Sequence, residues 1–302
     1  MPELPEVETV RLGVEKHVVG QTFTDVAVRH DRAVRRQTGG APELIGRLRG
    51  KTAVAARRRG KYLWLDLADA TGAVDEALVI HLGMSGQLRI VDDDESSDGK
   101  HLRIAARLSD RGFLFVDQRT FGGWQVDDLV PDVHDTARSV PSVVAHIAPD
   151  PFDEVYDAGL VAAVMRRKHT EVKRVLLDQT VVSGIGNIYA DEALWRARLR
   201  GTRLTDSISR AKLVELLQHA RDVMDAALAV GGTSFDELYV NVNGESGYFA
   251  RALNAYGREG QPCYRCGSLL RRESFMNRSS FYCPKCQRPP HRGTRSRAPS
   301  LA

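Results

Sequence analysis

The chain has no apolar run long enough to cross a membrane and no cysteine outside residues 263–286. A membrane-spanning helix needs roughly 20 consecutive apolar residues, and no stretch approaches that length. No secretory signal peptide precedes the acidic start of the sequence. We therefore expect a cytoplasmic protein that makes no membrane contact.

The familiar nucleotide-binding signatures are also missing from the one glycine-rich turn that leads into a helical pattern. Residues 182–192 contain neither the Lys-Ser/Thr of a nucleoside-triphosphate loop nor the Gly-x-Gly-x-x-Gly of a dinucleotide site. The turn is instead predicted to open a helix capped by Asn187, where free backbone N–H groups would favour a phosphate. Simple helix capping is the alternative interpretation.

The composition is that of a soluble protein whose charge is unevenly distributed. At 302 residues, 42% of them hydrophobic, the chain can bury two domain cores without disulfides. The formal charge is only +4, but residues 253–302 hold ten Lys/Arg against two Glu, so the remainder carries a net −4. A basic C-terminal module on a nearly neutral body indicates a polyanionic partner, with nucleic acid as the main candidate.

The first eight residues, MPELPEVE, place a proline directly after the initiator methionine. Removal of Met1 would expose the secondary amine of Pro2. An α-amino group has a reference pKa of roughly 8, against roughly 10.4 for lysine, so this amine is a candidate nucleophile. Glu3 beside it is a candidate proton donor or acceptor. An ordinary frayed terminus is the alternative.

A buried helix is predicted to follow the terminus at once. Pro5 suits the first helical turn, and an apolar stripe continues along one face at Val7, Val10, Val14 and Val18. Packing this helix into a core would fix Pro2 in space, which a catalytic terminus requires.

Short β-strands without a sequence repeat are predicted from residue 23 to about 125. In residues 61–67, Leu63, Leu65 and Leu67 share one face of a strand, and Lys61 has the same parity. Lys61 should therefore point inward at the mouth of the strand. The preceding basic run, residues 57–59, is either a solvated turn or an edge that contacts phosphates.

Two loops carry candidate probes for a nucleic acid. Met84 lies in HLGMSG, residues 81–86, where two glycines predict a tight loop, although a single methionine can equally be core filler. Arg119 and Phe121 are two residues apart, so in an extended loop they would project together and could enter a duplex. A structural turn around the neighbouring glycines is the alternative.

Residues 130–153 are rich in Pro, Asp and Ser and are predicted to form a hinge between the domains. Beyond the hinge the hydrophobic period becomes helical. The plainest helix has an apolar stripe from Leu213 to Leu228 and ends at the glycines 231 and 232.

All four cysteines form one pattern, Cys263-x2-Cys266 followed by Cys283-x2-Cys286. Paired knuckles of this spacing predict one structural Zn²⁺ held by four thiolates, with two disulfides as the alternative. Residues 269–282 are predicted to form a hairpin between the knuckles, exposing Arg278 to a groove or phosphate. The tail from residue 289 is basic and lacks a period, so we expect disorder there.

Taken together, these residues resemble the formamidopyrimidine-DNA glycosylase family of bacterial base-excision repair enzymes. The resemblance rests on PELPEVE (2–8), GKYL (60–63), HLGMSG (81–86), GIGNIYA (184–190) and the four-cysteine finger with Arg278. In order and spacing these motifs cover almost the whole chain.

The resemblance implies an α+β fold in five parts. They are an N-terminal two-layer β-sandwich flanked by helices (1–130), a hinge (131–153), a helical DNA-binding domain with a helix-two-turns-helix motif (154–252), a four-cysteine zinc finger (253–288) and a disordered basic tail (289–302). A monomer that binds double-stranded DNA in the cleft is expected.

The resemblance also assigns roles to residues. Pro2 would attack C1′ of the damaged nucleotide and form a Schiff base, while Glu3 would protonate the leaving base. Lys61 would assist β-elimination, and Arg278 would assist δ-elimination and grip a phosphate. Other matching positions contact DNA: Met84, Arg119 and Phe121 would fill the gap left by the extruded base, and Asn187 would contact the backbone at the lesion. His101 and Lys168 match positions that contact DNA.

Two segments depart from the family pattern, and a third supports a substrate class. The family commonly has Asp-Pro-Arg-Arg-Phe where residues 117–121 read Asp-Gln-Arg-Thr-Phe, so a second arginine is absent. His169 alters a basic run beside Lys168. Residues 242–249 resemble the mobile loop that closes over oxidised purines.

The sequence therefore predicts a bifunctional DNA glycosylase and abasic-site lyase for oxidised purines such as 8-oxoguanine and formamidopyrimidines. An oxidised-pyrimidine glycosylase of the same superfamily is one alternative. A non-catalytic DNA-binding zinc-finger protein is the other.

Overall fold

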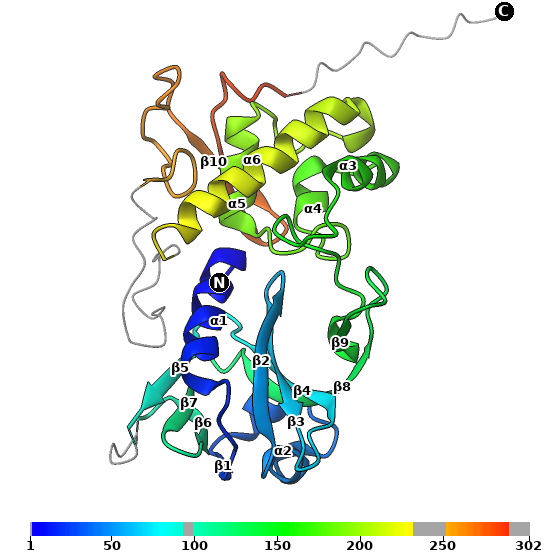
Figure 1. Ribbon diagram of the computed structural model, residues 1–302. Helices are drawn as coiled ribbons and strands as arrows, with labels where there is room; N and C mark the ends of the chain where they lie inside the picture. Colours follow the sequence, from blue (N-terminus) through cyan, green and yellow to red (C-terminus); the bar gives the residue numbers. More distant parts are fainter. Residues whose placement is uncertain (1, 93–98, 232–251, 290–302) are drawn as a thin grey trace, which may run out of the picture.

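The computed structural model describes residues 2–92, 99–231 and 252–289 (Figure 1). Within these residues an antiparallel β domain is followed by a helical domain that carries a two-stranded hairpin. The predicted α+β class is confirmed. Three features of the sequence analysis lie outside the described residues: Met1, the loop at 242–249 and the tail from residue 290.

Two antiparallel sheets make up the N-terminal domain, as predicted. The five-stranded sheet has the order β2-β3-β4-β8-β9: β2 (Thr52–Arg59), β3 (Tyr62–Ala68), β4 (Val74–His81), β8 (Gly123–Pro131) and β9 (Ser139–Pro141). The four-stranded sheet has the order β1-β6-β7-β5: β1 (Asp25–Val28), β6 (Leu102–Arg107), β7 (Gly112–Asp117) and β5 (Gly86–Val91). Their facing apolar side chains form one core together with Phe23 and Trp124.

Strand β3 is buried on both faces, although its sequence alternates. Leu63, Leu65 and Leu67 lie in the main core, as expected. Trp64, on the other face, packs against Val144 and other side chains that follow β9. The segment predicted as a hinge thus folds back on the sheet, while its limits at residues 131 and 153 stay a prediction.

Helix α1 (Leu4–Val18) connects the two domains. The predicted stripe from Val7 to Val18 is buried in the core of the β domain. Leu4, at the start of the same helix, belongs to the core of the helical domain. Burial at both ends of one helix fixes the N-terminus between the domains. A second helix, α2 (Gly40–Leu48), adds Leu44 and Leu48 to the β-domain core.

The helical domain contains α3 (Ala158–Arg167), α4 (Val172–Leu176), α5 (Asn187–Arg196) and α6 (Arg210–Leu228). The apolar stripe predicted for α6 is buried from Leu213 to Ala227. Strands β10 (Arg271–Phe275) and β11 (Arg278–Tyr282) pair as the predicted hairpin and turn at Met276 and Asn277, both with positive φ. None of the described helices combines the length and apolar character of a membrane span.

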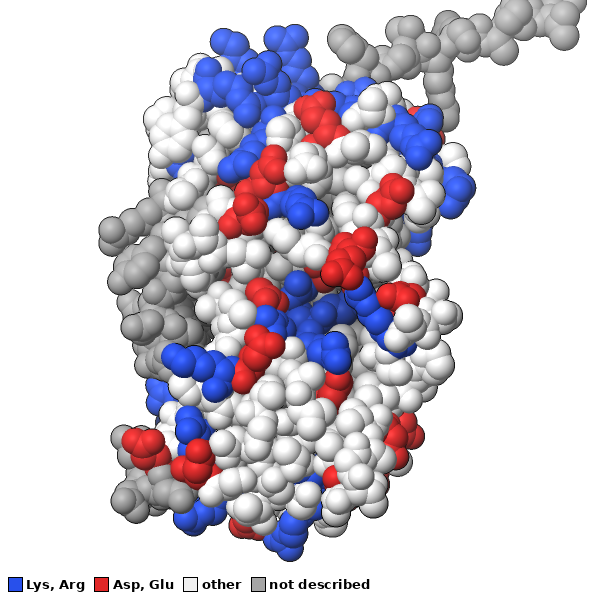
Figure 2. Space-filling view, viewed as in Figure 1, with Lys and Arg blue, Asp and Glu red and all other residues white. Residues whose placement is uncertain are grey.

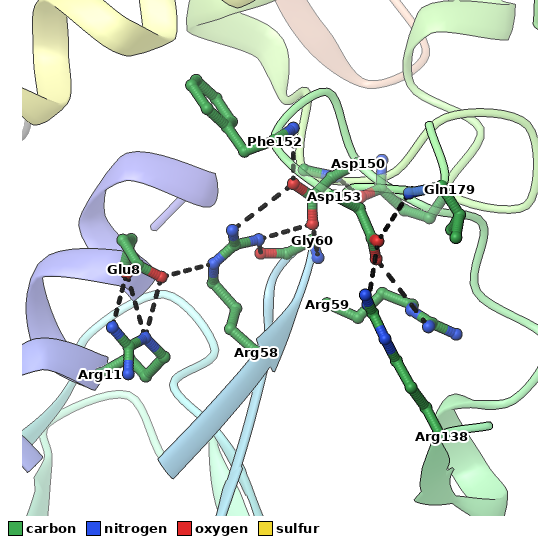
Figure 3. Close-up of polar contacts among 12 residues, drawn as sticks. Glu8, Arg11, Arg58, Arg59, Gly60, Arg138, Asp150, Phe152, Asp153 and Gln179 are labelled. Carbon is green, nitrogen blue, oxygen red and sulfur yellow. Dashed lines mark hydrogen bonds and ion pairs between the residues drawn. The ribbon is translucent and has the colours of Figure 1, made fainter. Parts of the chain in front are cut away.

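Ion pairs join the domains on the face shown in Figure 2, where basic and acidic side chains alternate at the junction. Arg58 Nε donates to Glu8 of α1 at 2.8 Å, and its Nη1 donates to Asp150 at 2.7 Å (Figure 3). The same Asp150 oxygen accepts the backbone N–H of Gly60 at 2.9 Å. Arg59 pairs with Asp132, and both side chains are buried. The basic run forms the end of β2 and not a turn. Arg58 and Arg59 are neutralised within the molecule, whereas Arg57, which pairs with Asp66, keeps 56% of its side chain exposed; a phosphate contact of this edge stays a prediction.

The linker that carries Asp150 is fixed to the helical domain. Arg221 of α6 donates to the carbonyl oxygen of Pro151 at 2.5 Å, and its guanidinium lies 5.1 Å from the centre of the Phe152 ring. Asp150 therefore connects α6, through Pro151, to Arg58 and Gly60 at the turn between β2 and β3.

We predict that Asp150→Asn lowers the free energy of unfolding by about 3 kcal/mol, since it leaves Arg58, whose side chain is only 10% exposed, short of a carboxylate. Glu154→Gln is the control, because Glu154 is an 86% exposed partner of Arg138 and should contribute less than about 1 kcal/mol. Urea unfolding of both variants measures the difference. Equal losses would contradict a buried interdomain pair.

Candidate active site

The carboxylate of Glu3 occupies the start of α5, on the opposite domain. Its oxygens accept the backbone N–H groups of Gly186 at 2.8 Å, Ile188 at 2.9 Å and Tyr189 at 3.4 Å. Three donors from one helix start satisfy groups that the helix leaves unpaired, and the positive end of the helix dipole favours the negative charge. Glu3 thus caps a helix that follows it by more than 180 residues.

This arrangement corrects the interpretation of the glycine-rich turn. The N–H groups expected to bind a phosphate are occupied by Glu3. Asn187 is the first residue of α5 and not its cap, because the N-cap position belongs to Gly186. The Asn187 Nδ2 donates instead to the carbonyl oxygen of Ser279 in the hairpin, at 2.8 Å. Its predicted contact with DNA stays a prediction.

Burial raises the pKa of Glu3, with a smaller contribution in the same direction from Glu6. Lys61 and the N–H groups of α5 act in the opposite direction, but burial outweighs them. Glu3 therefore retains its proton at a higher pH than an exposed glutamate. Glu6 also holds the terminus in place, since it accepts the N–H of Glu3 and the Tyr189 hydroxyl, both at 2.8 Å.

Pro2, Lys61 and Arg278 line one cavity of about 190 Å³. Its other walls are Val7, Tyr62, His81, Leu82, Gly83, Leu177 and Gln179. Lys61 Nζ donates to the carbonyl oxygen of Ile185 at 2.9 Å, just ahead of the start of α5. Three residues from the N-terminus, the β domain and the hairpin thus line a single cavity.

The pKa of Lys61 is shifted in the opposite direction to that of Glu3. Burial lowers the pKa of its ammonium group, and the positive charge of Arg278 lowers it further. Glu3 and Glu6 oppose this change without reversing it. A lysine with a lowered pKa is more often neutral near pH 7 and so better able to accept a proton.

The loops that carry Met84 and Arg119 pack backbone against backbone. Gly83 has a φ of +64°, and a Cβ there would meet the Gly122 nitrogen at 2.5 Å. Arg119 Nη1 consequently lies 3.6 Å from the Met84 sulfur. Phe121 projects from the same loop with 42% of its surface exposed. The structure thus brings the three predicted probes onto adjoining loops.

His101 and Lys168 do not line the cavity. His101 directly precedes β6, and its Nδ1 lies 3.4 Å from an Arg103 nitrogen. Lys168 ends α3, and its Nζ lies 3.3 Å from Asp178. The predicted DNA contacts of both residues stay predictions.

The four cysteines form a compact cluster. The sulfur atoms of Cys263, Cys266, Cys283 and Cys286 all lie within 4.8 Å of one another, and all four thiols are free. A tetrahedral metal with sulfur ligands at roughly 2.3 Å needs sulfur separations near 3.8 Å, so the cluster fits such an ion. N–H groups of Trp195 and Cys286 approach two of the sulfurs at 3.4 Å, which favours thiolates. These residues can hold one metal and leave no open coordination position.

A buried ion pair fixes the hairpin to the helical domain. Asp191 of α5 accepts bonds from Lys173 Nζ at 2.6 Å and from the backbone N–H of Phe281 at 2.8 Å. Burial raises the pKa of Asp191 to about 6, although Lys173 opposes the change. This attachment places Arg278, at the start of β11, in the wall of the cavity.

Comparison with known proteins identifies the family. Three family models match in order: the formamidopyrimidine-DNA glycosylase N-terminal domain at residues 1–124, the H2TH domain of the same enzymes at 147–238, and a zinc finger found in FPG and IleRS at 260–289. The formamidopyrimidine-DNA glycosylase of Mycobacteroides abscessus is 62% identical over 289 residues, covering 95% of this chain and 98% of that protein. This chain belongs to the formamidopyrimidine-DNA glycosylase family.

Other glycosylases of the family extend the likeness. The Rhodococcus jostii protein is 60% identical over 97% of this chain and 98% of its own length. A Lactococcus lactis variant, solved with DNA containing Fapy-dG, has a TM-score of 0.82 and 31% identity over 95% of this chain and all of that chain. The Lactococcus lactis protein with abasic-site DNA has a TM-score of 0.80 and 31% identity, with the same coverage.

Several residues that build the glycosylase site were missed in the sequence. Glu6 carries no signal of a site role in the sequence, and Asp150 lies only within the predicted hinge. Gln179 accepts the N–H of Gly184 and donates to the Ile185 carbonyl oxygen that also binds Lys61. Of these residues only Asp150 has a local sequence feature that could have marked it: it lies between Pro149 and Pro151, which restrict the backbone around its carboxylate.

We predict that Gly186→Ala weakens the glycosylase fold, because the added Cβ would overlap the Glu3 carboxyl group. Loss of this buried cap should lower the free energy of unfolding by about 2 kcal/mol. Gly46→Ala is the matched control: Gly46 lies in α2 with nothing within 4 Å of its Cβ position, so the change should stabilise by about 0.5–1 kcal/mol. Urea unfolding compares them, and a neutral Gly186→Ala would contradict the role of Glu3 as a cap.

Proposed function

We propose that this chain is a bifunctional DNA glycosylase and abasic-site lyase that excises oxidised purines such as 8-oxoguanine and formamidopyrimidines. The observation that carries the proposal is the single cavity shared by Pro2, Lys61 and Arg278, directly beside the buried Glu3. Family membership supports the glycosylase activity, and the Lactococcus lactis complexes with Fapy-dG and abasic-site DNA support both substrates.

The chemistry begins with the amine of Pro2 once Met1 has been removed. Its lone pair attacks C1′ of the damaged nucleotide, the C1′–N bond to the base breaks, and Glu3 protonates the departing base. The Pro2 nitrogen, having lost its proton, then expels O4′: the C1′–O4′ bond breaks as O4′ takes up a proton, and a C1′=N⁺ Schiff base forms. This cation acidifies the C2′ proton, which a neutral Lys61 helps to remove. The 3′ phosphate then leaves by β-elimination and the 5′ phosphate by δ-elimination, with Arg278 stabilising phosphate charge.

Double-stranded DNA binds a monomer across the junction between the domains. Extrusion of the damaged base leaves a gap, which Met84, Arg119 and Phe121 fill. Asn187 contacts the backbone at the lesion, His101 and Lys168 make further DNA contacts, and the basic hairpin adds salt-dependent affinity.

Zinc is the metal that the four cysteines hold. Four thiolates in a closed tetrahedral set are typical of a structural Zn²⁺, which when bound fixes both knuckles of the finger. The finger then presents the hairpin, and with it Arg278, to the DNA.

Glu3→Gln should slow base excision by about 10²–10⁴-fold, the usual contribution of a general acid. Cleavage of DNA that already has an abasic site should persist, because no base remains to be protonated. In the wild type, excision should decline as pH rises through the raised pKa of Glu3, whereas abasic-site cleavage should lack that decline. Rates measured across pH on both duplexes test this, with Glu15→Gln as the control, since Glu15 pairs with Arg11 on the exposed side of α1.

Removal of the metal should detach the finger. We expect a chelator strong enough to remove zinc from the four thiolates, or Cys283→Ser, to reduce DNA affinity at least about tenfold, or ~1.4 kcal/mol. The fluorescence of Trp195 should change as well, since its indole N–H lies 3.4 Å from the Cys263 sulfur. Metal content and DNA affinity are measured on the same samples. Unchanged affinity after complete loss of zinc would contradict the structural role.

Duplexes carrying 8-oxoguanine, a formamidopyrimidine or an oxidised pyrimidine separate this proposal from its alternatives. Preference for the two purine lesions supports it. Preference for the pyrimidine lesion favours the related pyrimidine glycosylases, and tight lesion binding without cleavage favours a non-catalytic protein.

A further inference from the structure

The loop that carries Arg119 and Phe121 is held by its backbone on two sides. On the inner side the buried carboxylate of Asp117 accepts the N–H groups of Arg119 at 3.1 Å and Gly122 at 2.8 Å. On the outer side the guanidinium of Arg35 donates to the carbonyl oxygens of three successive residues. One carboxylate and one guanidinium thus hold the N–H groups and the carbonyl groups of the same turn.

The contacts of Arg35 are specific to its forked geometry. Nη2 donates to the Phe121 carbonyl oxygen at 2.7 Å, and Nη1 lies 3.1 Å from that of Gly122 and 3.5 Å from that of Thr120. Nη1 also donates to the carbonyl oxygen of Arg32 at 2.7 Å, which ties the fork to its own segment. A planar guanidinium can serve several acceptors at once, whereas a lysine ammonium is a compact point charge on a flexible stem.

The backbone of this loop needs such support. Thr120 has a φ of +54°, and a β-branched residue in the left-handed region is strained. Gly122 lies so close to the β domain that a Cβ would meet the His81 carbonyl oxygen at 2.5 Å and the Phe115 ring at 2.7 Å. The loop is therefore pressed inward at Gly122 and strained at Thr120, and outward movement is opposed by the bonds from Arg35.

The orientation of the probes depends on this backbone. The Arg32 guanidinium lies 6.0 Å from the centre of the exposed Phe121 ring. Arg119 reaches the Met84 sulfur only because the two loops meet at Gly83 and Gly122. A shift of the turn would separate Phe121 and Arg119 from both neighbours.

We infer that Arg35 is a positioning residue that holds the loop of Arg119 and Phe121 in the conformation that enters DNA when a damaged base is extruded. The inference rests on the proposed function, in which these side chains fill the gap. Arg35 need not touch the reacting atoms, because it acts through the carbonyl groups of residues 120–122.

If Arg35 has this role, the two reactions of the active site should differ in their dependence on it. Excision of 8-oxoguanine requires a stacked base to leave the duplex, so it depends on the probe loop. Cleavage at a pre-formed abasic site has no base to extrude. Loss of Arg35 should therefore slow the first reaction and spare the second.

The test compares Arg35→Lys and Arg35→Met with the wild type in single-turnover reactions on both duplexes. Both variants should excise 8-oxoguanine at least about tenfold more slowly, a change of ~1.4 kcal/mol in the barrier, with little change at the abasic site. Fluorescence of 2-aminopurine placed beside the lesion should show reduced extrusion. Arg49→Met is the control, since Arg49 pairs with Asp25 on the exposed surface of the β domain.

A double variant tests whether Arg35 acts through Phe121. Phe121→Ala alone should show the same split, and adding Arg35→Met to it should cost little more, because coupled residues are not additive. Full additivity would overturn the inference.

Three other outcomes are decisive. Wild-type excision by Arg35→Lys would mean that a positive charge suffices, as in a direct phosphate contact, and would overturn the positioning role. Equal loss of both reactions in both Arg35 variants would overturn it in favour of a general structural role. Failure of the wild type on both duplexes would contradict the proposed function itself, which the Arg35 variants leave untouched.

Discussion

The carboxylate of Glu3 at the start of α5 is the interaction on which the site depends. It ties the first residues of the chain to a helix of the other domain, through three backbone N–H groups. Leu4 adds an apolar anchor, since it is buried in the core of the helical domain while the rest of α1 packs in the β domain. A terminus held in this way cannot fray, so Pro2 has a defined place in the cavity. The residue that would protonate the leaving base is thus also the residue that assembles the cavity.

Burial at the junction of the domains shifts the two central groups in opposite directions. It raises the pKa of Glu3 and lowers that of Lys61, so each retains more of its neutral form near pH 7. The arginines on the other face of the junction are paired with carboxylates, as Arg58 is with Glu8 and Asp150. The active-site cavity is lined instead by Lys61 and Arg278, and burial lowers the pKa of Lys61.

Local patterns in the sequence predicted the elements of this fold but not their partners. The valine stripe of α1, the strand at Leu63 and the cysteine spacing each reflect a period or a ligand geometry contained within a short segment. The bond from Arg58 to Asp150 joins residues 92 apart, and that from Gly186 to Glu3 joins residues 183 apart. Such pairs depend on how two domains meet, which no local period encodes. For the same reason the sequence left open whether the arginine run and the glycine-rich turn bind phosphate, since it could not show that Arg58, Arg59 and the N–H groups of α5 are satisfied internally.

Borohydride reduction during reaction with a duplex carrying one 8-oxoguanine tests the central claim, that the terminal amine held by this junction is the nucleophile. The samples are the processed protein, a form that retains Met1, and Lys61→Met. We predict a covalent protein–DNA complex with the processed protein and with Lys61→Met, mapped by mass to Pro2, and almost none when Met1 is retained. A complex mapped to Lys61, or excision that persists with Met1 in place, would contradict the account.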